Sequence, residues 1–196
     1  MSTMETTRQR LPAAERRESI LAAATVVFGE RGYAGATTDQ IATAAGISQA
    51  YVVRTFGSKE TLFVEVARRA VGRIEAAFRS AIEADDGRPV DQRLGQAYLE
   101  LIADRGILLA LLHIFSLGND PAIGPVGREG FLTIYRLVRD EAGLAPEDAS
   151  HFLAEGMLIN TVLALQLHDC DDPDALELVT QACGGDLVRF RALAAG

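Results

Sequence analysis

Residues 37–59 read TTDQIATAAGISQAYVVRTFGSK, and this segment contains two short helical patterns joined by a tight turn. The first pattern begins at Thr37 or Thr38 and the second at Ser48, because a hydroxyl side chain caps the free N–H groups at a helix N-terminus. Gly46 lies between them, where glycine accepts the left-handed backbone that ends a helix. Two short helices around such a turn predict a helix-turn-helix, whose second helix enters the major groove of DNA.

Further residues on both sides of this segment extend the pattern. They are Arg17, Ile20-Leu21-Ala22-Ala23-Ala24, Val27-Phe28, Glu30-Arg31-Gly32-Tyr33, Gly35, Phe56, Ser58-Lys59-Glu60 and Leu62-Phe63. Their order and spacing resemble the N-terminal domain of the TetR family of bacterial transcriptional regulators across residues 14–74. The resemblance implies an all-α fold of about nine helices. A three-helix, TetR-type helix-turn-helix DNA-binding domain would occupy 14–74, and a helical effector-binding and dimerisation domain would occupy 75–196.

The rest of the chain is predicted to be helical from its own pattern. Breaks at 85–89, 118–121, 143–146 and 169–173 each contain proline, and no sustained alternating strand pattern lies between them. The sequence therefore predicts an all-α fold. In addition to the two helices of the helix-turn-helix, the expected helices are 12–30, 59–84, 90–104, 106–116, 122–142, 147–168 and 173–194.

Composition limits the classes of protein that fit. The 196 residues suffice for a core without disulfides or metal. No run of 18 apolar residues predicts a transmembrane span, and residues 1–10 lack the apolar stretch of a secretory signal. Cys170 and Cys183 lack metal-ligand spacing, so they indicate reduced thiols in a cytoplasmic protein, with a disulfide as the alternative. We expect no cofactor, no metal and no membrane partner.

The net charge of −8 is unevenly distributed along the chain. Residues 1–60 contain seven basic and six acidic side chains, whereas residues 61–196 contain 12 basic and 21 acidic ones. Because local charge at the groove decides binding to DNA, the acidic second part does not exclude a DNA-binding first part. The sequence therefore predicts double-stranded DNA, in the form of an operator, as one partner.

The expected DNA contacts lie on the second helix of the motif and at helix N-termini. A glutamine such as Gln49 bonds adenine, Arg54 reaches guanine or phosphate, and N-terminal hydroxyl and N–H groups favour phosphate. Two alternatives stay open: Tyr51 packs against Phe56 or the first helix, and Lys59 is a capping or surface lysine. The expected DNA-binding residues are Thr37, Thr38, Ser48, Gln49, Ala50, Tyr51, Arg54, Thr55 and Lys59.

Two positions of the second helix depart from the family pattern. Val53 stands where a tyrosine is common, and Thr55 stands where a histidine or tyrosine is common. In the family those side chains often touch phosphates, so the resemblance implies that two backbone contacts are missing here. Arg54 and Tyr51 are the candidate replacements.

The last two expected helices are more apolar than one buried face requires. Residues 157–167 are apolar nearly all round, and the final helix carries a second apolar set that includes Val179, Leu187 and Phe190. A two-fold, four-helix interface would bury the surplus. The resemblance implies the same homodimer, through the last two helices. The alternative is a monomer in which both helices lie in the core.

The resemblance also implies a cavity for a small-molecule effector in the second domain. Such a cavity is mainly apolar and has few polar groups. The residue types leave an alternative open, because a histidine such as His113 and aromatic residues at helical spacing also occur as ordinary core residues. The side chains expected to line the cavity are Tyr98, His113, Phe115, Phe131, Tyr135, Met157 and Asn160, with His168 as a further polar candidate.

These observations predict a ligand-responsive, DNA-binding transcriptional regulator. The family's usual mode is a repressor that releases a near-palindromic operator when a small molecule binds the C-terminal domain. An enzyme is not expected, because the chain lacks a phosphate-binding loop, an HExxH pattern, a nucleophile elbow and a Cys/His cluster. The remaining alternative is a helical small-molecule-binding protein with a retained but non-functional DNA-binding head.

Overall fold

A computed structural model describes residues 12–84, 86–104 and 106–195 of the chain. Within these ranges it contains ten α-helices and no strand, which confirms the all-α prediction. The α-helices are α1 (Ala13–Gly35), α2 (Thr38–Ala44), α3 (Gln49–Phe56), α4 (Lys59–Glu83), α5 (Val90–Glu100), α6 (Ile107–Ser116), α7 (Ile123–Arg136), α8 (Pro146–Ala164), α9 (Pro173–Ala182) and α10 (Leu187–Ala195). Short turns of 3-10 or π geometry follow three of them, at Leu101–Ala103, Leu137–Glu141 and Leu167–Asp169.

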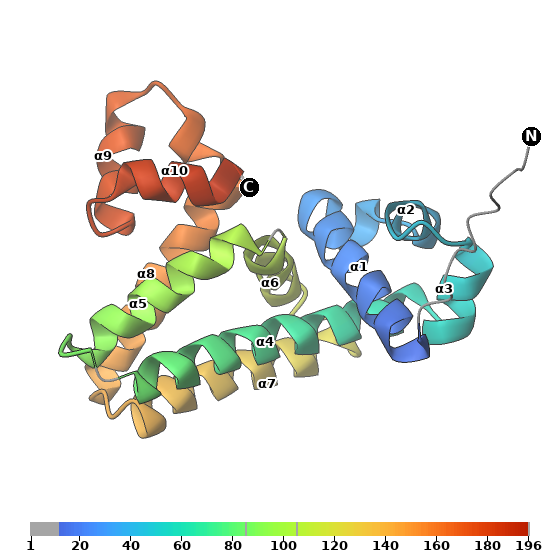
Figure 1. Ribbon diagram of the computed structural model, residues 1–196, viewed down its shortest axis with the longest axis horizontal. Coiled ribbons are helices and arrows are strands. Elements are labelled where there is room, and N and C mark those ends of the chain that lie inside the picture. Colours follow the sequence, from blue (N-terminus) through green and yellow to red (C-terminus); the bar gives the residue numbers. More distant parts are fainter. Residues whose placement is uncertain (1–11, 85, 105, 196) are drawn as a thin grey trace, which may run out of the picture.

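The helices α1, α2 and α3 gather at one end of the molecule, and the long helix α4 runs from them into the rest of the chain (Figure 1). α7 lies beside α4 along much of its length, while α5, α6 and α8 pack around this pair. α9 and α10 lie at the far end from α3 (Figure 1). None of the helices in the described part of the chain has the length and apolar character needed to cross a bilayer.

Hydroxyl caps set the helix boundaries of the helix-turn-helix. Thr37 Oγ1 accepts a hydrogen bond from the Gln40 N–H at 3.2 Å, and Gln40 Oε1 accepts one from the Thr37 N–H at 3.0 Å, which together form a capping box. Ser48 Oγ caps α3 by accepting from the Tyr51 N–H at 3.3 Å. Gly46 has a φ of +66°, so the left-handed turn predicted between α2 and α3 is confirmed.

Glycines also interrupt the first and last predicted helices. Gly32 has a φ of +66° inside α1, so the regular helix stops there as predicted and one further turn reaches Gly35. The prediction of one helix over 173–194 is wrong, because the chain divides at Gly184 and Gly185 into α9 and α10. Their φ values of +66° and +94° lie in the left-handed region, which a continuous helix excludes.

The buried core continues from the helix-turn-helix into the remaining helices through α4. Near α1, the ring of Phe63 packs against Phe28 and Tyr33, with centroid distances of 4.7 and 5.0 Å. Further along α4, the ring of Phe78 packs against Phe152 of α8 at 5.6 Å. Because α4 carries both Phe63 and Phe78, a single rigid helix anchors both parts of the core.

α7 presents glycines to its neighbours and packs closely against them. A Cβ added at Gly127 would lie 3.2 Å from the Cγ2 of Ile114 on α6. A Cβ added at Gly130 would lie 2.6 Å from the Cγ2 of Val71 on α4. Real Cβ atoms essentially never approach a neighbour as closely as 2.6 Å, so a side chain at position 130 would force Val71 or α4 to shift.

α1 docks on α6 through contacts in which backbone meets backbone. A Cβ added at Gly29 would lie 2.9 Å from the Cα of Gly106, and one added at Gly106 would lie 2.7 Å from the carbonyl oxygen of Thr25. Further along α6, His113 Nε2 lies 3.2 Å from the carbonyl oxygen of Gly29. The close approach of the two helices therefore depends on Gly29 within α1 and on Gly106 at the N-cap of α6.

We predict that Gly106→Ala lowers the free energy of unfolding by about 1–3 kcal/mol. The added methyl group would clash with the Thr25 carbonyl, and the φ of +87° is strained for alanine. Gly95→Ala in α5 is the control: nothing lies within 4 Å of its Cβ position, so alanine should raise stability by about 0.5–1 kcal/mol. Urea unfolding followed by circular dichroism measures both changes. Equal effects of the two substitutions would contradict the close contact.

Candidate functional site

The outer face of α3 carries side chains that sequence analysis assigned to DNA. Val52 and Phe56 expose only 1% and 6% of their surface, so they hold the inner face of the helix against the core. Gln49, Ala50 and Arg54 are exposed on the other side. α3 thus presents a short polar surface from a helix that is fixed by its buried residues.

Tyr51 on α3 is flanked by two guanidinium groups. The guanidinium carbon of Arg54 lies 4.9 Å from the centre of the Tyr51 ring, and that of Arg16 from α1 lies 5.7 Å from it. Cation–π attraction orients both arginines beside the outer face of α3. Arg54 could be predicted from the sequence but Arg16 could not, because no spacing rule connects a residue of α1 to a ring of α3.

Polar side chains at the starts of α2 and α3 bond to each other. Gln49 Nε2 donates to Thr38 Oγ1 at 2.9 Å, which joins the two helix N-termini. The hydroxyl of Thr55 donates to the carbonyl of Tyr51 at 2.8 Å, one turn earlier in its own helix. The structure therefore brings the predicted residues of α2 and α3 to one surface, while the Thr55 hydroxyl is engaged within α3.

Lys59, at the first position of α4, directs its ammonium group toward the segment between α1 and α2. Nζ donates to the carbonyl oxygens of Tyr33 at 2.8 Å and Ala36 at 3.1 Å, and it lies 4.5 Å from the centre of the Tyr33 ring. Two of the three ammonium donors are therefore used inside the protein. The contacts give Lys59 a structural role that the expectation of a phosphate contact did not include.

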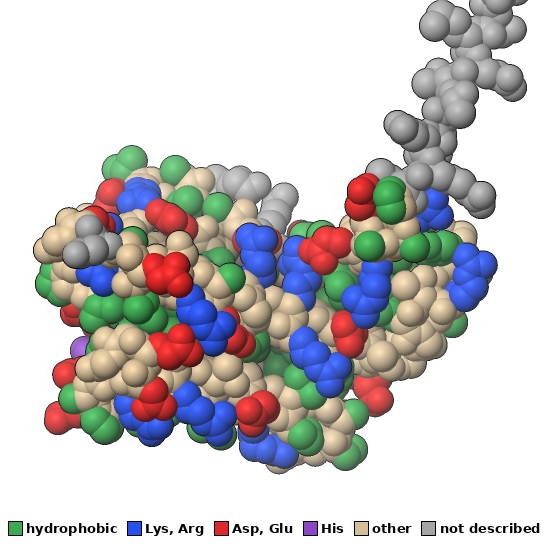
Figure 2. All heavy atoms as spheres, turned by 60° about the horizontal axis from the view of Figure 1, so that its bottom comes forward, with side chains coloured by type: hydrophobic (Ala, Val, Ile, Leu, Met, Phe, Trp, Pro, Cys, Tyr) green, Lys and Arg blue, Asp and Glu red, His purple; other side chains and the backbone are tan. Residues whose placement is uncertain are grey.

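Charges of both signs are interspersed on the surface shown in Figure 2. Two ion pairs join α1 to α4 among the described residues, Arg17 with Glu65 at 2.9 Å and Arg69 with Glu18 at 2.7 Å. The hydrogen bond from Arg17 lowers the pKa of the Glu65 carboxyl below its ordinary value. The arginine charge in these two pairs is thus neutralised locally, and each exposed pair contributes only about 0–1 kcal/mol.

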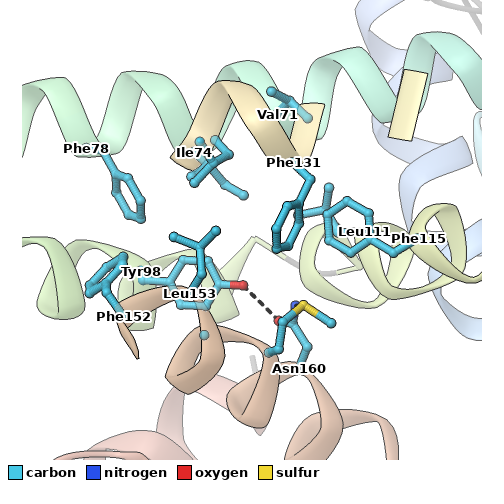
Figure 3. A pocket seen from close by; sticks show the side chains of 13 residues that line it. Val71, Ile74, Phe78, Tyr98, Leu111, Phe115, Phe131, Phe152, Leu153 and Asn160 are labelled. Atoms are coloured by element: carbon cyan, nitrogen blue, oxygen red, sulfur yellow. Dashed lines mark hydrogen bonds between the residues drawn. The ribbon is translucent and has the colours of Figure 1, made fainter. Parts of the chain in front are cut away.

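A narrow apolar cavity of about 40 Å³ lies among α4, α5, α6, α7 and α8. Figure 3 shows Ile74 and Phe78 of α4 on one side of it, with Tyr98 of α5 and Asn160 of α8 on the other. Every side chain that lines the cavity is uncharged. Its volume holds only a few water molecules.

One hydrogen bond crosses the polar side of the cavity. The Tyr98 hydroxyl donates to Asn160 Oδ1 at 3.0 Å, and Asn160 exposes only 1% of its surface (Figure 3). Burial raises the pKa of the Tyr98 phenol above its ordinary value, an effect that the bond to Asn160 partly opposes. The phenol is therefore neutral at any physiological pH.

An open groove of about 410 Å³ between α7 and α8 adjoins the cavity. Phe131, Leu153 and Met157 line both spaces, so these three side chains separate the buried cavity from the groove. Leu132 and Tyr135 line the groove alone. The structure thus contains a small apolar cavity and a larger, more open groove that share three lining side chains.

The structure gathers most of the expected effector residues but not all of them. His113 lies against α1 instead, and the His168 ring packs 5.9 Å from Phe190 of α10. Apolar lining residues such as Ile74 and Leu153 were missed, because at helical spacing they are indistinguishable from ordinary core residues. No group of three or more His, Cys, Asp or Glu among the described residues is placed to hold a metal. Of the expected residues, those that line the cavity are Tyr98, Phe115, Phe131, Met157 and Asn160, while Tyr135 lines the groove.

Residues 20–66, which span most of α1 and all of α2 and α3, match the sequence profile described as "Bacterial regulatory proteins, tetR family". These residues therefore form an N-terminal domain of the TetR family. The chain is 36% identical over 94 residues to the transcriptional activator FasR of Mycolicibacterium smegmatis, a match that covers 47% of this chain and 43% of FasR. It is 40% identical over 58 residues to the transcriptional repressor AcnR of Corynebacterium glutamicum, covering 30% of this chain and 31% of AcnR. The chain thus spans less than half of the length of these relatives, which are regulators and not enzymes.

Solved structures of other regulators share the fold over more than nine tenths of this chain. A TetR-like regulator from Rhodococcus sp. RHA1 superimposes with a TM-score of 0.63 at 21% identity, covering 95% of this chain and 97% of the other. The fatty acid degradation regulator FadR of Bacillus halodurans gives a TM-score of 0.63 at 22% identity, covering 91% and 96%. At these identities the likeness concerns the fold, which extends beyond the helix-turn-helix to the remaining helices.

We predict that Lys59→Met lowers the free energy of unfolding by about 1–2 kcal/mol, because the carbonyls of Tyr33 and Ala36 lose a charged donor. Arg68→Met is the matched control, since Arg68 is a largely exposed residue of α4 that pairs only with Glu65. That control should change stability by less than about 0.5 kcal/mol. Urea unfolding measures the change in stability of both variants. Equal changes in Lys59→Met and Arg68→Met would refute the structural role of Lys59.

Proposed function

We propose that this TetR-family chain is a ligand-responsive transcriptional regulator, acting as a repressor that releases a near-palindromic operator when a small molecule binds its C-terminal domain. One observation carries the proposal: α3 presents Gln49, Ala50 and Arg54 on an exposed face while its other face is buried. A rigid helix with a short polar outer face, preceded by a tight turn, is the geometry that reads base edges in a major groove.

In this proposal the DNA contacts divide into two kinds. Gln49 and Arg54 read base edges, with Ala50 beside them, because amide and guanidinium groups form paired hydrogen bonds with purines. Arg16 joins them as a phosphate contact, since its guanidinium is held beside Tyr51 at the edge of the same surface. Other phosphate contacts of the proposal come from the helix starts and flanks, namely Thr37, Thr38, Ser48, Tyr51, Thr55 and Lys59.

In this proposal, residues 14–74 form the DNA-binding domain and residues 75–196 form the effector-binding and dimerisation domain. Two helices support a connection between them. α4 begins beside α3 and lines the cavity with Ile74 and Phe78, while α6 lines it with Leu111 and contacts α1 through Gly106. An effector that prefers one arrangement of these helices shifts the protein toward it, by an amount equal to its differential affinity for the two arrangements.

Repression rather than activation is the finer part of the proposal. AcnR is a repressor and FasR is an activator, so relatives of both kinds exist. In a repressor, the form without ligand binds the operator and occupancy of the cavity weakens that binding. A regulator of this type works in the bacterial cytoplasm, where its DNA is.

The proposal also includes a homodimer. Its interface is formed by the two helices predicted at 147–168 and 173–194, which correspond to α8 and to α9 with α10. Three of the six large apolar side chains that the described residues expose lie in this segment, namely Leu165, Leu178 and Val188. A two-fold interface would bury them and set two copies of α3 side by side. Such an arrangement reads half-sites about 34–36 Å apart or at a longer spacing, which is why the operator is expected to be a near-palindrome.

The DNA-binding prediction is tested by selecting bound fragments from random duplex DNA and measuring affinity by fluorescence anisotropy at several salt concentrations. Arg16→Ala should weaken binding to selected and scrambled DNA alike and reduce the salt slope by about 0.9 per lost phosphate contact. Gln49→Ala should instead change the preferred base at one position of each half-site. Equal loss on selected and scrambled DNA for Gln49→Ala would remove its assignment as a base-reading residue.

Failure of the folded protein to bind any duplex at low ionic strength would favour the second candidate function. That candidate is a helical small-molecule-binding protein with a retained but non-functional head. The observation that favours it is Val53, an apolar side chain of α3 that is 44% exposed where the family commonly has a tyrosine.

The dimer prediction is tested by sedimentation velocity at micromolar concentration. Leu178→Arg on α9 should convert a dimer to a monomer, because it places a charge in the apolar interface. Leu132→Arg is the matched control, since Leu132 of α7 is similarly exposed, at 44% against 40% for Leu178, but lies outside the last helices. A wild-type chain that sediments as a monomer, or a control that dissociates equally, would contradict the proposed interface.

A further inference from the structure

The lining of the cavity and of the adjoining groove restricts the charge of a ligand. Among the described residues, no Asp, Glu, Lys, Arg or His lines either space. An ionised ligand would give up its hydration on entering the cavity and would gain no counter-charge there. The side chains therefore favour a molecule without charge over an acid or an amine of the same size.

Asn160 supplies the cavity with a hydrogen-bond donor that has no strong acceptor. Its Oδ1 accepts from the Tyr98 hydroxyl, but the one partner of its Nδ2 within the described ranges is the sulfur of Met157, at 3.9 Å. A thioether is a weak acceptor, and buried polar groups are normally paired with strong ones. Because Asn160 is 99% buried and lines the cavity, its amide N–H is placed to bind an oxygen of the ligand.

The dimensions of the two spaces indicate an elongated ligand. The buried cavity of about 40 Å³ is smaller than a ligand site, which typically measures roughly 300–1,000 Å³, whereas the groove of about 410 Å³ falls in that range. A molecule of ordinary ligand size that bonds Asn160 exceeds the cavity, and the groove beyond the shared lining residues has the volume to hold its remainder. Of these shared residues, Phe131 rests edge-on against Phe115 at 5.3 Å, and Met157 is unbranched and adapts its shape.

We infer that the effector is an uncharged, elongated, mainly apolar molecule with a carbonyl-type oxygen at its buried end. The oxygen accepts a hydrogen bond from Asn160 Nδ2, and the apolar remainder passes between Phe131 and Met157 into the groove between α7 and α8. This inference rests on the proposed function, because it names the chemical class of the effector that the regulator responds to.

The test compares three probes that share one chain length and differ in charge. They are 2-decanone, decanoate at pH 7.5 and decylammonium, each titrated into the full chain by isothermal titration calorimetry. The ketone should bind, and the two ions should bind at least about tenfold more weakly, because neither finds a counter-charge. An ion that binds as tightly as the ketone, or a ketone that does not bind the folded protein at millimolar concentration, would overturn the inference.

A double variant tests the role of Asn160 without leaving a buried polar group unpaired. Tyr98→Phe combined with Asn160→Leu replaces both partners of the buried hydrogen bond by apolar groups, a change that folded proteins tolerate better than loss of one partner. It should weaken binding of 2-decanone about tenfold, whereas Thr161→Ala, at the exposed neighbouring position of α8, should leave it unchanged. Unchanged ketone affinity in the folded double variant would remove Asn160 as the ligand's donor.

These titrations contain no DNA, so their outcome is separate from that of the proposed function. If the chain binds an operator but not the ketone, the inferred class of effector is refuted while the proposed regulatory function is retained. If it binds the ketone as described but binds no duplex, the inferred class of ligand is retained for the cavity and the proposed regulatory function is refuted.

Discussion

The backbone contact between α1 and α6 is the constraint on which the relation between the two parts of the molecule depends. Gly29 and Gly106 lie so close that neither tolerates a Cβ, and the His113 ring approaches α1 at Gly29 and Gly32. Interiors packed this closely do not deform gradually, because any displacement opens a void or creates a clash. The orientation of α1, and with it of α2 and α3, is therefore tied to the position of α6.

This arrangement explains how one chain can join the exposed face of α3, proposed to read DNA, to an apolar cavity. α6 touches α1 at its N-terminal end and the cavity through Leu111 and Phe115, and α4 holds the cores of both parts through Phe63 and Phe78. A molecule in the cavity therefore pushes against the same two helices that position the head. Because the cavity is small in this structure, occupancy requires these helices or their side chains to move.

Local signals were the ones that sequence analysis could interpret. The caps at Thr37 and Ser48 and the left-handed turn at Gly46 depend on neighbouring residues, so the helix-turn-helix could be predicted with its boundaries. The break at Gly184-Gly185 was underestimated, since two glycines weaken a helix but tertiary contacts decide whether it ends. The cavity was only partly predictable. Tyr98 and Asn160 carry polar groups that single them out, whereas the Arg16 contact with Tyr51 and the position of His113 depend on how distant helices meet.

The glycine face of α7 has a consequence for how proteins of this type diversify. Gly130 is in contact with Val71, and Val71 lines the cavity although Gly130 does not. A methyl group at position 130 would displace Val71 or the whole of α4 and so change the width of the cavity while every lining residue stays the same. Selectivity for the size of a bound molecule can thus evolve by substitution at position 130, although this residue does not line the cavity.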